Sequence, residues 1–383
     1  MNLKDKLVSS YLAFDDHLED DSPIHEIRKK AIHTFEKKGF PTKKEEDWKY
    51  TSLKSILSKD YSVFPKGNKE VKFKKVRNYF LYDIDSYKLV FIDGVYSSFL
   101  SETTHDGLDI CLLSAALSKS KYKATIENYY NQAASKNSIT SLNTAFAKEG
   151  AYINIPKNKE VEKPIEIINF STGNESALMV QPRNLIVVGE NAHVQLIERH
   201  QSLTSNSVFT NSVTEVFAEK RAYLDYYKIQ NDKENASLID NTTIHQEQES
   251  NCKVHSFSLG GKLTRNNLNF IQNGEHCEST LKGVTILKDK QHVDQLKNAF
   301  DKRIITKSDY DVLFNSLELF SVIEHLKRLL GIKEFKSDSL STPAVELFIN
   351  NTGIESINRI GQEIEKSLSE NSDLIQKLIS ELK

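Results

Sequence analysis

The sequence predicts a mainly β protein with a parallel β-helix (β-solenoid) core, a helical N-terminal region and a helical C-terminal segment. Three observations predict this fold. Short segments rich in β-branched and aromatic residues fill residues 151–294, which is typical of strands. Similar turns recur among these segments at a nearly constant interval. On either side, in residues 1–150 and 295–383, the sequence pattern is mostly typical of helices.

In the N-terminal region, a first clear helix is expected to begin at Ser22–Pro23. Serine is a favoured N-cap, and proline is tolerated in the first turn, where its missing N–H costs nothing. Gly39 is placed to end the helix in the left-handed conformation. The apolar face of this helix is formed by Ile24, Ile27, Ala31 and Phe35.

The rest of the N-terminal region is predicted to contain one strand-like segment and a further helical run. Lys88–Leu100 has strand character, with Asp93–Gly94 as its turn. The helical run is expected over about Lys121–Lys148. The single tryptophan, Trp48, lies between these segments and the first helix.

The β-helix is predicted from a repeated turn. Each of four polar turns ends in a small side chain, and a strand-like segment follows directly. These small residues are Ala192, Ala222, Cys252 and Cys277; the first three are evenly spaced, and the last interval is shorter. Stacked strands lie about 4.8 Å apart, so a corner of the coil favours a small side chain. A regular repeat made of strands predicts coils that cover one another.

This repeat gives the cysteines a structural interpretation. Cys252 and Cys277 are expected to be small buried corner residues, which is how free cysteine usually behaves. His255 lies an odd number of residues from Cys252, so the two side chains are expected on opposite faces of a strand. A metal site shared by this pair is therefore not expected.

Other candidates for chemistry are few. His276, Cys277 and His292 are the remaining candidates for a metal ligand, because each lies near another ligand type or at the end of the strand region. The third cysteine, Cys111, is far from the others, and no C-x-x-C pair is present. Phosphate-binding, dinucleotide-binding, zinc-protease and serine-hydrolase motifs are also absent, so no catalytic residue is assigned.

The composition excludes several classes of function. The formal net charge is -2, so no overall positive field favours nucleic acid. No signal peptide and no apolar run of about 18 residues is found, which predicts a cytoplasmic protein without a membrane span. A carbohydrate-active β-helix enzyme would require clustered acids on one face of the solenoid. Asp225, Asp232 and Asp240 show no stacking at the repeat period.

The C-terminal segment, residues 295–383, reads mostly as helix. Ser341-Thr342-Pro343 resembles the start of one helix, and Leu368 to Leu382 is amphipathic. These helices are expected to cap the open end of the solenoid, whose strand edge would otherwise invite aggregation.

Two motifs in the expected order resemble the SufB/SufD family, and SufD in particular. The segment FEKKGFPTKKEEDWKYTSL (Phe35–Leu53) is similar to the family's N-terminal signature. QPRNLIVVGENAHVQLIERHQS and GVTILKDKQHVD are similar to its core, including a His-x-Asp at His292 and Asp294. The residues that carry the N-terminal match are Gly39, Pro41, Glu46, Trp48, Lys49, Tyr50 and Thr51. The resemblance covers about residues 20–294.

This resemblance implies a non-catalytic, SufD-like scaffold subunit of the SUF iron–sulfur cluster assembly complex, with SufB-like and SufC-like partners. The sequence assigns no cofactor to the chain itself; an iron–sulfur cluster and a flavin are implied only at the level of the complex. The family's later His-x-x-P and Ser-His-Gly segments are absent here. The alternatives are a β-helix interaction module that has lost the assembly role and a carbohydrate-active β-helix enzyme.

Overall fold

A computed structural model describes residues 2–15, 23–64, 76, 79–80, 84–102, 107–132, 137–173 and 177–286, together with Ser356, Arg359, Gln362, Glu363 and Lys366. The chain divides into two compact units, Met1–His292 and Val293–Lys383. Apart from these last five residues, the predicted helical segment 295–383 lies outside the described residues. The same holds for His292 and Asp294 of the predicted core motif.

The core of the first unit is made of two sheets. Within the described residues, the first sheet has eight strands and the second has seven. The first sheet contains β1 (Tyr61–Ser62), β4 (Asp109–Leu112), β5 (Ala151–Ile155), β7 (Ala177–Val180), β8 (Arg183–Val188), β10 (Val208–Ala218), β12 (Ala236–Gln246) and β14 (Leu263–Gln272). The second contains β2 (Tyr87–Ile92), β3 (Val95–Tyr96), β6 (Ile165–Ser171), β9 (His193–Ser202), β11 (Tyr223–Asp232), β13 (Asn251–Gly260) and β15 (Glu278–Ile286).

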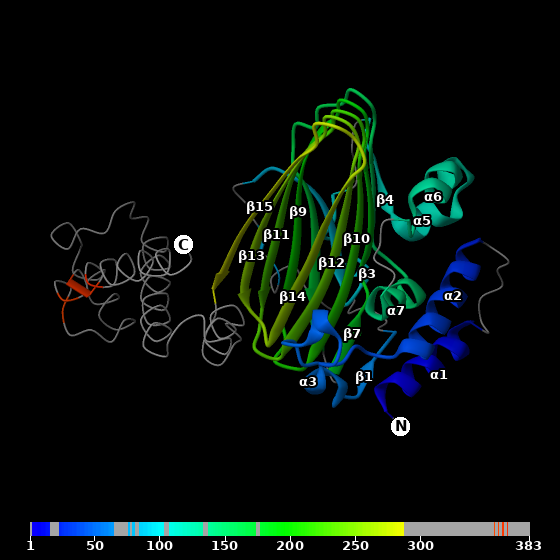
Figure 1. Ribbon diagram of the computed structural model, residues 1–383, viewed down its shortest axis with the longest axis vertical. Coiled ribbons are helices and arrows are strands. Elements are labelled where there is room, and N and C mark those ends of the chain that lie inside the picture. Colours follow the sequence, from blue (N-terminus) through cyan, green and yellow to red (C-terminus); the bar gives the residue numbers. More distant parts are fainter. Residues whose placement is uncertain are drawn as a thin grey trace. The chain divides into compact units, whose positions relative to one another are not determined.

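The chain winds between these two sheets as a flattened parallel β-helix. From β9 to β15, successive strands alternate between the sheets, so each coil contributes one strand to each (Figure 1). His193, Tyr223, Asn251 and Glu278 lie side by side in neighbouring parallel strands, although each is a full coil further along the chain than the one before. The predicted β-solenoid core is therefore confirmed.

Each coil enters the second sheet through the same corner. The corner residue has a positive φ and the next residue has a small side chain, which relieves crowding where coils stack. The corner residues are Asn191 (φ 56°), Arg221 (57°), Glu249 (61°) and His276 (59°). The small residues that follow them are Ala192, Ala222, Ser250 and Cys277.

The predicted corner position of Cys252 is wrong. Cys252 lies beyond the corner on β13, where it pairs with Leu224 of the preceding coil and Ser279 of the next. Ser250 takes the corner position instead, because the coil from Tyr223 to Asn251 is shorter than the coil from His193 to Tyr223. Ser250 and Cys252 are separated by one residue, and such a shift keeps a side chain on the same face of a strand. Cys252 is therefore still fully buried in the core, as expected. Cys277 does occupy the corner, but it is only half-buried, because no described coil covers it.

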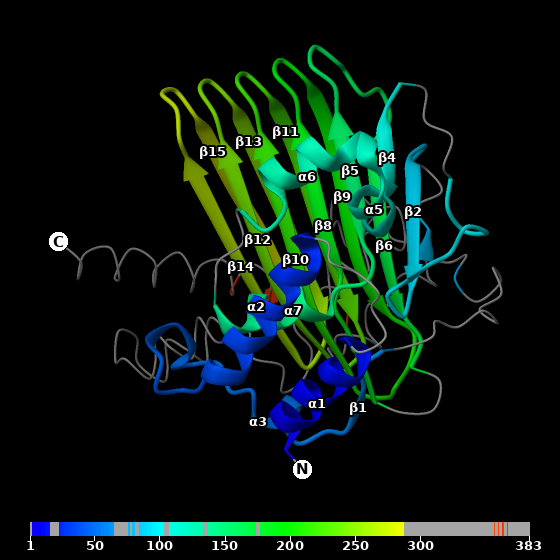
Figure 2. The same ribbon diagram turned by 90° about the vertical axis from the view of Figure 1, so that its right-hand side faces the viewer.

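The helices of the N-terminal region cover the outer face of the first sheet (Figure 2). α7 is buried along its whole length, and its Leu142 and Phe146 join Phe209 and Ile239 of the sheet in one apolar cluster. The helices are α1 (Leu3–Asp15), α2 (Pro23–Lys38), η1 (Glu46–Trp48), α3 (Lys54–Leu57), α5 (Leu113–Ser118), η3 (Ser120–Tyr122), α6 (Lys123–Tyr129) and α7 (Ser138–Phe146).

Two of the local predictions for this region are confirmed. α2 begins at Pro23, and Gly39 follows its end with a φ of 70°. Asp93 and Gly94, with φ values of 52° and 77°, form the turn between the antiparallel strands β2 and β3. The predicted N-cap, Ser22, lies outside the described residues.

The helical run predicted over about Lys121–Lys148 is helical in part but is broken in the middle. It contains the separate helices α6 and α7, and after α6 the backbone of Tyr130 is extended and Asn131 has a φ of 59°. The break has a tertiary cause, because the Asn131 amide donates a hydrogen bond of 2.9 Å to the buried Glu215 carboxylate of β10.

The N-terminal region also contributes strands. β2 and β4 extend the second and first sheets, so the solenoid includes segments that precede residue 151. Among the described helices, none combines the length and the apolar character needed to cross a membrane.

Candidate functional site

The space between the two sheets changes from apolar to polar along the strands. Near the corner it is filled by buried apolar side chains, including Val194, Leu224 and Cys252 of the second sheet and Val216 of the first. Farther along the same strands, the inward positions become polar. The buried polar residues there are Asn184, Glu198, His200, Thr214, Lys228, Asp240 and Thr242.

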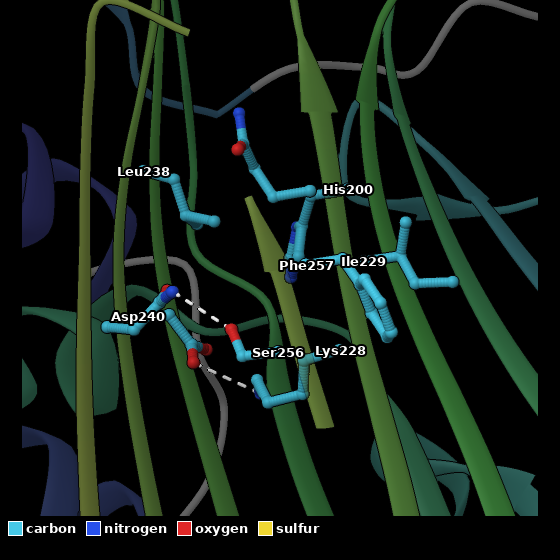
Figure 3. A pocket seen from close by; sticks show the side chains of 9 residues that line it. His200, Lys228, Ile229, Leu238, Asp240, Ser256 and Phe257 are labelled. Atoms are coloured by element: carbon cyan, nitrogen blue, oxygen red, sulfur yellow. Dashed lines mark hydrogen bonds and ion pairs between the residues drawn. The ribbon is translucent and has the colours of Figure 1, made fainter. Parts of the chain in front are cut away.

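Four of these residues form a buried ionic cluster, which we define as Glu198, His200, Lys228 and Asp240. The Lys228 ammonium lies 2.6 Å from Glu198 Oε2 and 3.1 Å from Asp240 Oδ2. His200 Nε2 lies 3.3 Å from Glu198 Oε1. The members come from β9, β11 and β12, so the cluster links both sheets. Figure 3 shows Lys228 and Asp240 pointing toward each other.

Neutral side chains complete the hydrogen bonding of the ionic cluster. Lys228 also donates a 2.8 Å hydrogen bond to Thr242, and Tyr226 donates one to Glu198. Asn184 donates a hydrogen bond of 3.1 Å to Glu198 Oε1 from the opposite sheet. Asp240 Oδ1, in contrast, is buried and has no hydrogen-bond partner. One carboxylate oxygen of the cluster is therefore free to accept another group.

The surroundings stabilise opposite charges on the central pair. Burial by itself raises the pKa of Glu198, but the Lys228 ammonium and the hydrogen bond with His200 outweigh it and hold that pKa well below its usual range. Burial lowers the pKa of Lys228, and the Asp240 and Glu198 carboxylates more than reverse this, leaving it well above the usual value. Burial and the nearby Glu198 charge raise the pKa of Tyr226, which keeps its hydroxyl protonated.

A small cavity of about 10 Å³ adjoins the ionic cluster, which is about the room that one water molecule needs. His200, Lys228 and Asp240 line it, together with Ser256 and Asn266 of the next coil (Figure 3). Asn266 is itself exposed, so the cavity lies one side chain away from the surface.

The last described coil forms a second candidate surface, which we call the open end. In the described part of the chain, β15 pairs only with β13 and β14 pairs only with β12. Leu281 and Val284 of β15 are 59% and 48% exposed, and Ile271 of β14 is 38% exposed. Within the described residues, both sheets thus end here in a strand edge with apolar side chains.

The predicted ligands His276 and Cys277 lie at the corner of this last coil. His276 is exposed, with a φ of 59°. The Cys277 thiol lies 3.2 Å from the carbonyl oxygens of Glu247 and Gly274. Donation to a carbonyl suits a neutral thiol, whereas a metal ligand would be a thiolate. A metal-binding role for His276, Cys277 and His292 stays a prediction, and His292 lies outside the described residues.

The ionic cluster was not predicted from the sequence. In the sequence, Asp240 shows no stacking with other acids at the repeat period, and in the structure it neighbours Ser212 and Asn266 in its ladder. The signal available in the sequence was the alternation of side chains along the strand, which places every second residue on the same face. Glu198 and His200 occupy the same face of β9 as Val194 and Leu196, so two ionisable residues stood at core positions.

The N-terminal motif packs onto the solenoid at β14. Trp48 is buried, and the Arg265 guanidinium of β14 lies 4.2 Å from the centre of its ring. Arg265 also donates a hydrogen bond of 3.1 Å to Thr51. The motif residues therefore hold a strand of the open end that lies far away in the sequence.

Comparisons with known proteins agree with this architecture. The family model described as "SufBD protein N-terminal region" matches residues 1–167, and the model "SUF system FeS cluster assembly, SufBD core domain" matches residues 170–310. The chain is 28% identical over 284 residues to an iron–sulfur cluster assembly SufBD family protein of Synechocystis, which covers 72% of this chain and 62% of that protein.

Two further relatives are similar over much of the chain. The iron–sulfur cluster assembly protein SufD of Escherichia coli is 25% identical over 249 residues, covering 64% of this chain and 54% of that one. The chloroplastic protein ABCI7 of Arabidopsis thaliana is 25% identical over 285 residues, covering 71% and 58%. The chain thus spans 54% to 62% of the length of these relatives. With both family models matched in order over residues 1–167 and 170–310, the chain belongs to the SufB/SufD family.

Proposed function

We propose that this chain is a non-catalytic, SufD-like scaffold subunit of SUF iron–sulfur cluster assembly, acting in the cytoplasm with a SufB-like subunit and a SufC-like ATPase. Family membership supports the assembly role, as do the assembly functions for which its relatives are named. The sequence has no nucleotide-binding loop of its own, which fits a subunit that leaves ATP hydrolysis to a partner.

The observation that carries the pairing is the open end. Parallel strand edges offer unpaired N–H and C=O groups to another strand, and apolar side chains beside them favour burial against a partner. The Glu278 N–H donates a 2.9 Å hydrogen bond to the carbonyl oxygen of Ser250, which directly precedes β13. Because these groups alternate along a strand, Ser279 and Leu281 direct theirs toward the side of β15 on which no described strand lies. A second solenoid of the same family would continue both sheets across this end.

The test is co-purification of the full chain with SufB-like and SufC-like proteins from the same genome. The wild-type chain is expected to retain both partners. Leu281→Lys places a charge at the strand edge and is expected to lower recovery of the SufB-like subunit at least tenfold. Asn231→Lys is the matched control, since Asn231 is exposed on β11, a strand with neighbours on both sides.

The outcomes separate the parts of the proposal. Failure of the wild-type chain to retain either partner would refute the scaffold role. Equal recovery by Leu281→Lys and Asn231→Lys would refute pairing through the open end. Retention of the SufB-like subunit without the SufC-like ATPase would favour an interaction module that no longer takes part in assembly.

A further inference from the structure

The ionic cluster combines three side chains that commonly bind metals. One ligand atom from each of Glu198, His200 and Asp240 lies within 4.8 Å of the others, and all three residues are buried. Ligand atoms around a transition ion are about 3 to 4 Å apart, since each lies about 2 Å from the metal. A small contraction of the side chains would bring these atoms to that spacing.

Both the net charge of the ionic cluster and a carboxylate oxygen without a hydrogen-bond partner favour the binding of a further cation. Two carboxylates and one ammonium leave one net negative charge when the imidazole is neutral. An uncompensated buried charge is costly, so a positive group is favoured here. Lys228 contacts Glu198 Oε2 and Asp240 Oδ2, while Asp240 Oδ1 has no partner and Glu198 Oε1 faces His200. The two carboxylate oxygens that the lysine does not contact are therefore Asp240 Oδ1 and Glu198 Oε1, and the latter lies beside the imidazole and accepts a hydrogen bond from Asn184.

We propose that Glu198, His200 and Asp240 form a binding site for a divalent first-row transition ion inside the solenoid. One imidazole nitrogen with two carboxylate oxygens suits ions such as Mn²⁺, Fe²⁺, Co²⁺ and Zn²⁺, whereas Ca²⁺ takes six to eight oxygen ligands. The adjoining cavity supplies space for one water as a further ligand. This inference is independent of the proposed assembly role.

Lys228 is assigned a second role in the same site. Its ammonium is hydrogen-bonded to Glu198, ion-paired with Asp240 and repels a cation a few ångströms away, so lysine and metal compete for the negative charge of the cluster. The path for an entering ion is short, because the exposed Asn266 and the half-buried Ser256 line the cavity on the side of the next coil.

The test uses Co²⁺ and Mn²⁺ with the purified full chain. Co²⁺ binding is followed by its visible absorption, and Mn²⁺ binding by the loss of the free-ion signal in electron paramagnetic resonance. Asp240→Asn and His200→Gln are each expected to weaken binding at least tenfold. Lys228→Met is expected to strengthen binding at least tenfold, because it removes the competing ammonium.

Asp240→Asn and His200→Gln are expected to weaken metal binding, whereas Lys228→Met is expected to strengthen it. A cluster with a purely structural role would not change metal affinity in these opposite directions. His255→Gln is the control, since His255 stacks on Tyr227 away from the cluster and its loss is expected to leave affinity unchanged. Far-UV circular dichroism of each metal-free variant checks the fold. If Asp240→Asn and His200→Gln fold but bind as the wild type does, or if Lys228→Met binds more weakly, the proposal is wrong.

If a variant does not fold, the proposal is tested on the wild-type chain alone. Crystals of the wild-type chain grown with Mn²⁺ are expected to show an anomalous difference peak between Glu198, His200 and Asp240. The absence of a peak there at millimolar Mn²⁺ would overturn the proposal. Neither result bears on co-purification with the SUF partners, so the two proposals fail separately.

Discussion

The buried ion pair between Arg183 of β8 and Glu215 of β10 is expected to be a main link between the solenoid and the helices that cover it. Both side chains are fully buried and in direct contact. Arg183 also donates a 2.9 Å hydrogen bond to Thr144 of α7 and a longer one to Asn131. Replacing Arg183 with methionine removes all of these contacts while keeping most of the side-chain volume.

The expected cost follows from what Arg183→Met leaves behind. Glu215 becomes a buried carboxylate that has lost its guanidinium partner and keeps the Asn131 amide at 2.9 Å. Removing one partner of a buried ion pair typically costs about 3–5 kcal/mol, because the other charge stays buried without it. We therefore expect the free energy of unfolding to fall by about 4 kcal/mol.

The assay is urea unfolding followed by circular dichroism, with the midpoint and the slope both reported. Arg221→Met is the matched control, because Arg221 forms an exposed ion pair with Glu190 at 2.7 Å and a much smaller loss is expected. The double variant Arg183→Met/Glu215→Leu should be more stable than Arg183→Met, since it removes the buried carboxylate that has lost its guanidinium. A loss below about 1 kcal/mol for Arg183→Met, or a less stable double variant, would contradict this reasoning.

Three further predictions concern the helical cover and the core. Asn137 caps α7 by accepting a 2.9 Å hydrogen bond from the Thr140 amide. Asn137→Ala should therefore lower the free energy of unfolding by about 1 kcal/mol in the same urea assay. An unchanged unfolding midpoint would contradict this capping role. Burial raises the pKa of the Cys252 thiol to about 12, so very little of it is thiolate at pH 8. Cys252→Ala should therefore leave unchanged the number of thiols that react rapidly with a disulfide reagent. If the variant loses one rapidly reacting thiol, Cys252 is accessible and the prediction is wrong. Arg265→Ala removes the cation stacked on Trp48, so tryptophan fluorescence should shift to longer wavelength as the ring becomes solvated, while an unchanged spectrum would mean that Arg265 does not hold the motif.

The fold of the solenoid could largely be predicted because its signals are local. The turn residues Asp93 and Gly94 need only their own backbone preferences to form a hairpin. The helix from Pro23 to Lys38 carries its own start signal, and Gly39 after it is the stop signal. The repeated corner was found for the same reason. The corner was predicted at Cys252 and lies at Ser250, because coils of unequal length break a fixed repeat period. The burial of Cys252 was still predicted correctly, because a shift of two residues keeps a side chain on the same face of the strand.

The ionic cluster could not be predicted in this way. Glu198 and Asp240 are far apart in the sequence, and they meet only because the coil brings β9 and β12 to opposite sides of the same interior. The break between α6 and α7 has a similar origin, since the Asn131 backbone is held by Glu215, a residue of a later strand. Such contacts depend on the length of each coil, which local preferences do not specify.

The amino-acid sequence by itself therefore determined the strand-rich repeat, three of its four corners, its turns and the family motifs, because each is a property of neighbouring residues. Only the tertiary structure decided which coil positions stack, which charges meet between the sheets and which strand edges are unpaired in the described chain. The physical reason is that alternation along a strand specifies the face of each side chain, whereas its partner across the sheet or the interior is specified by how the whole coil closes.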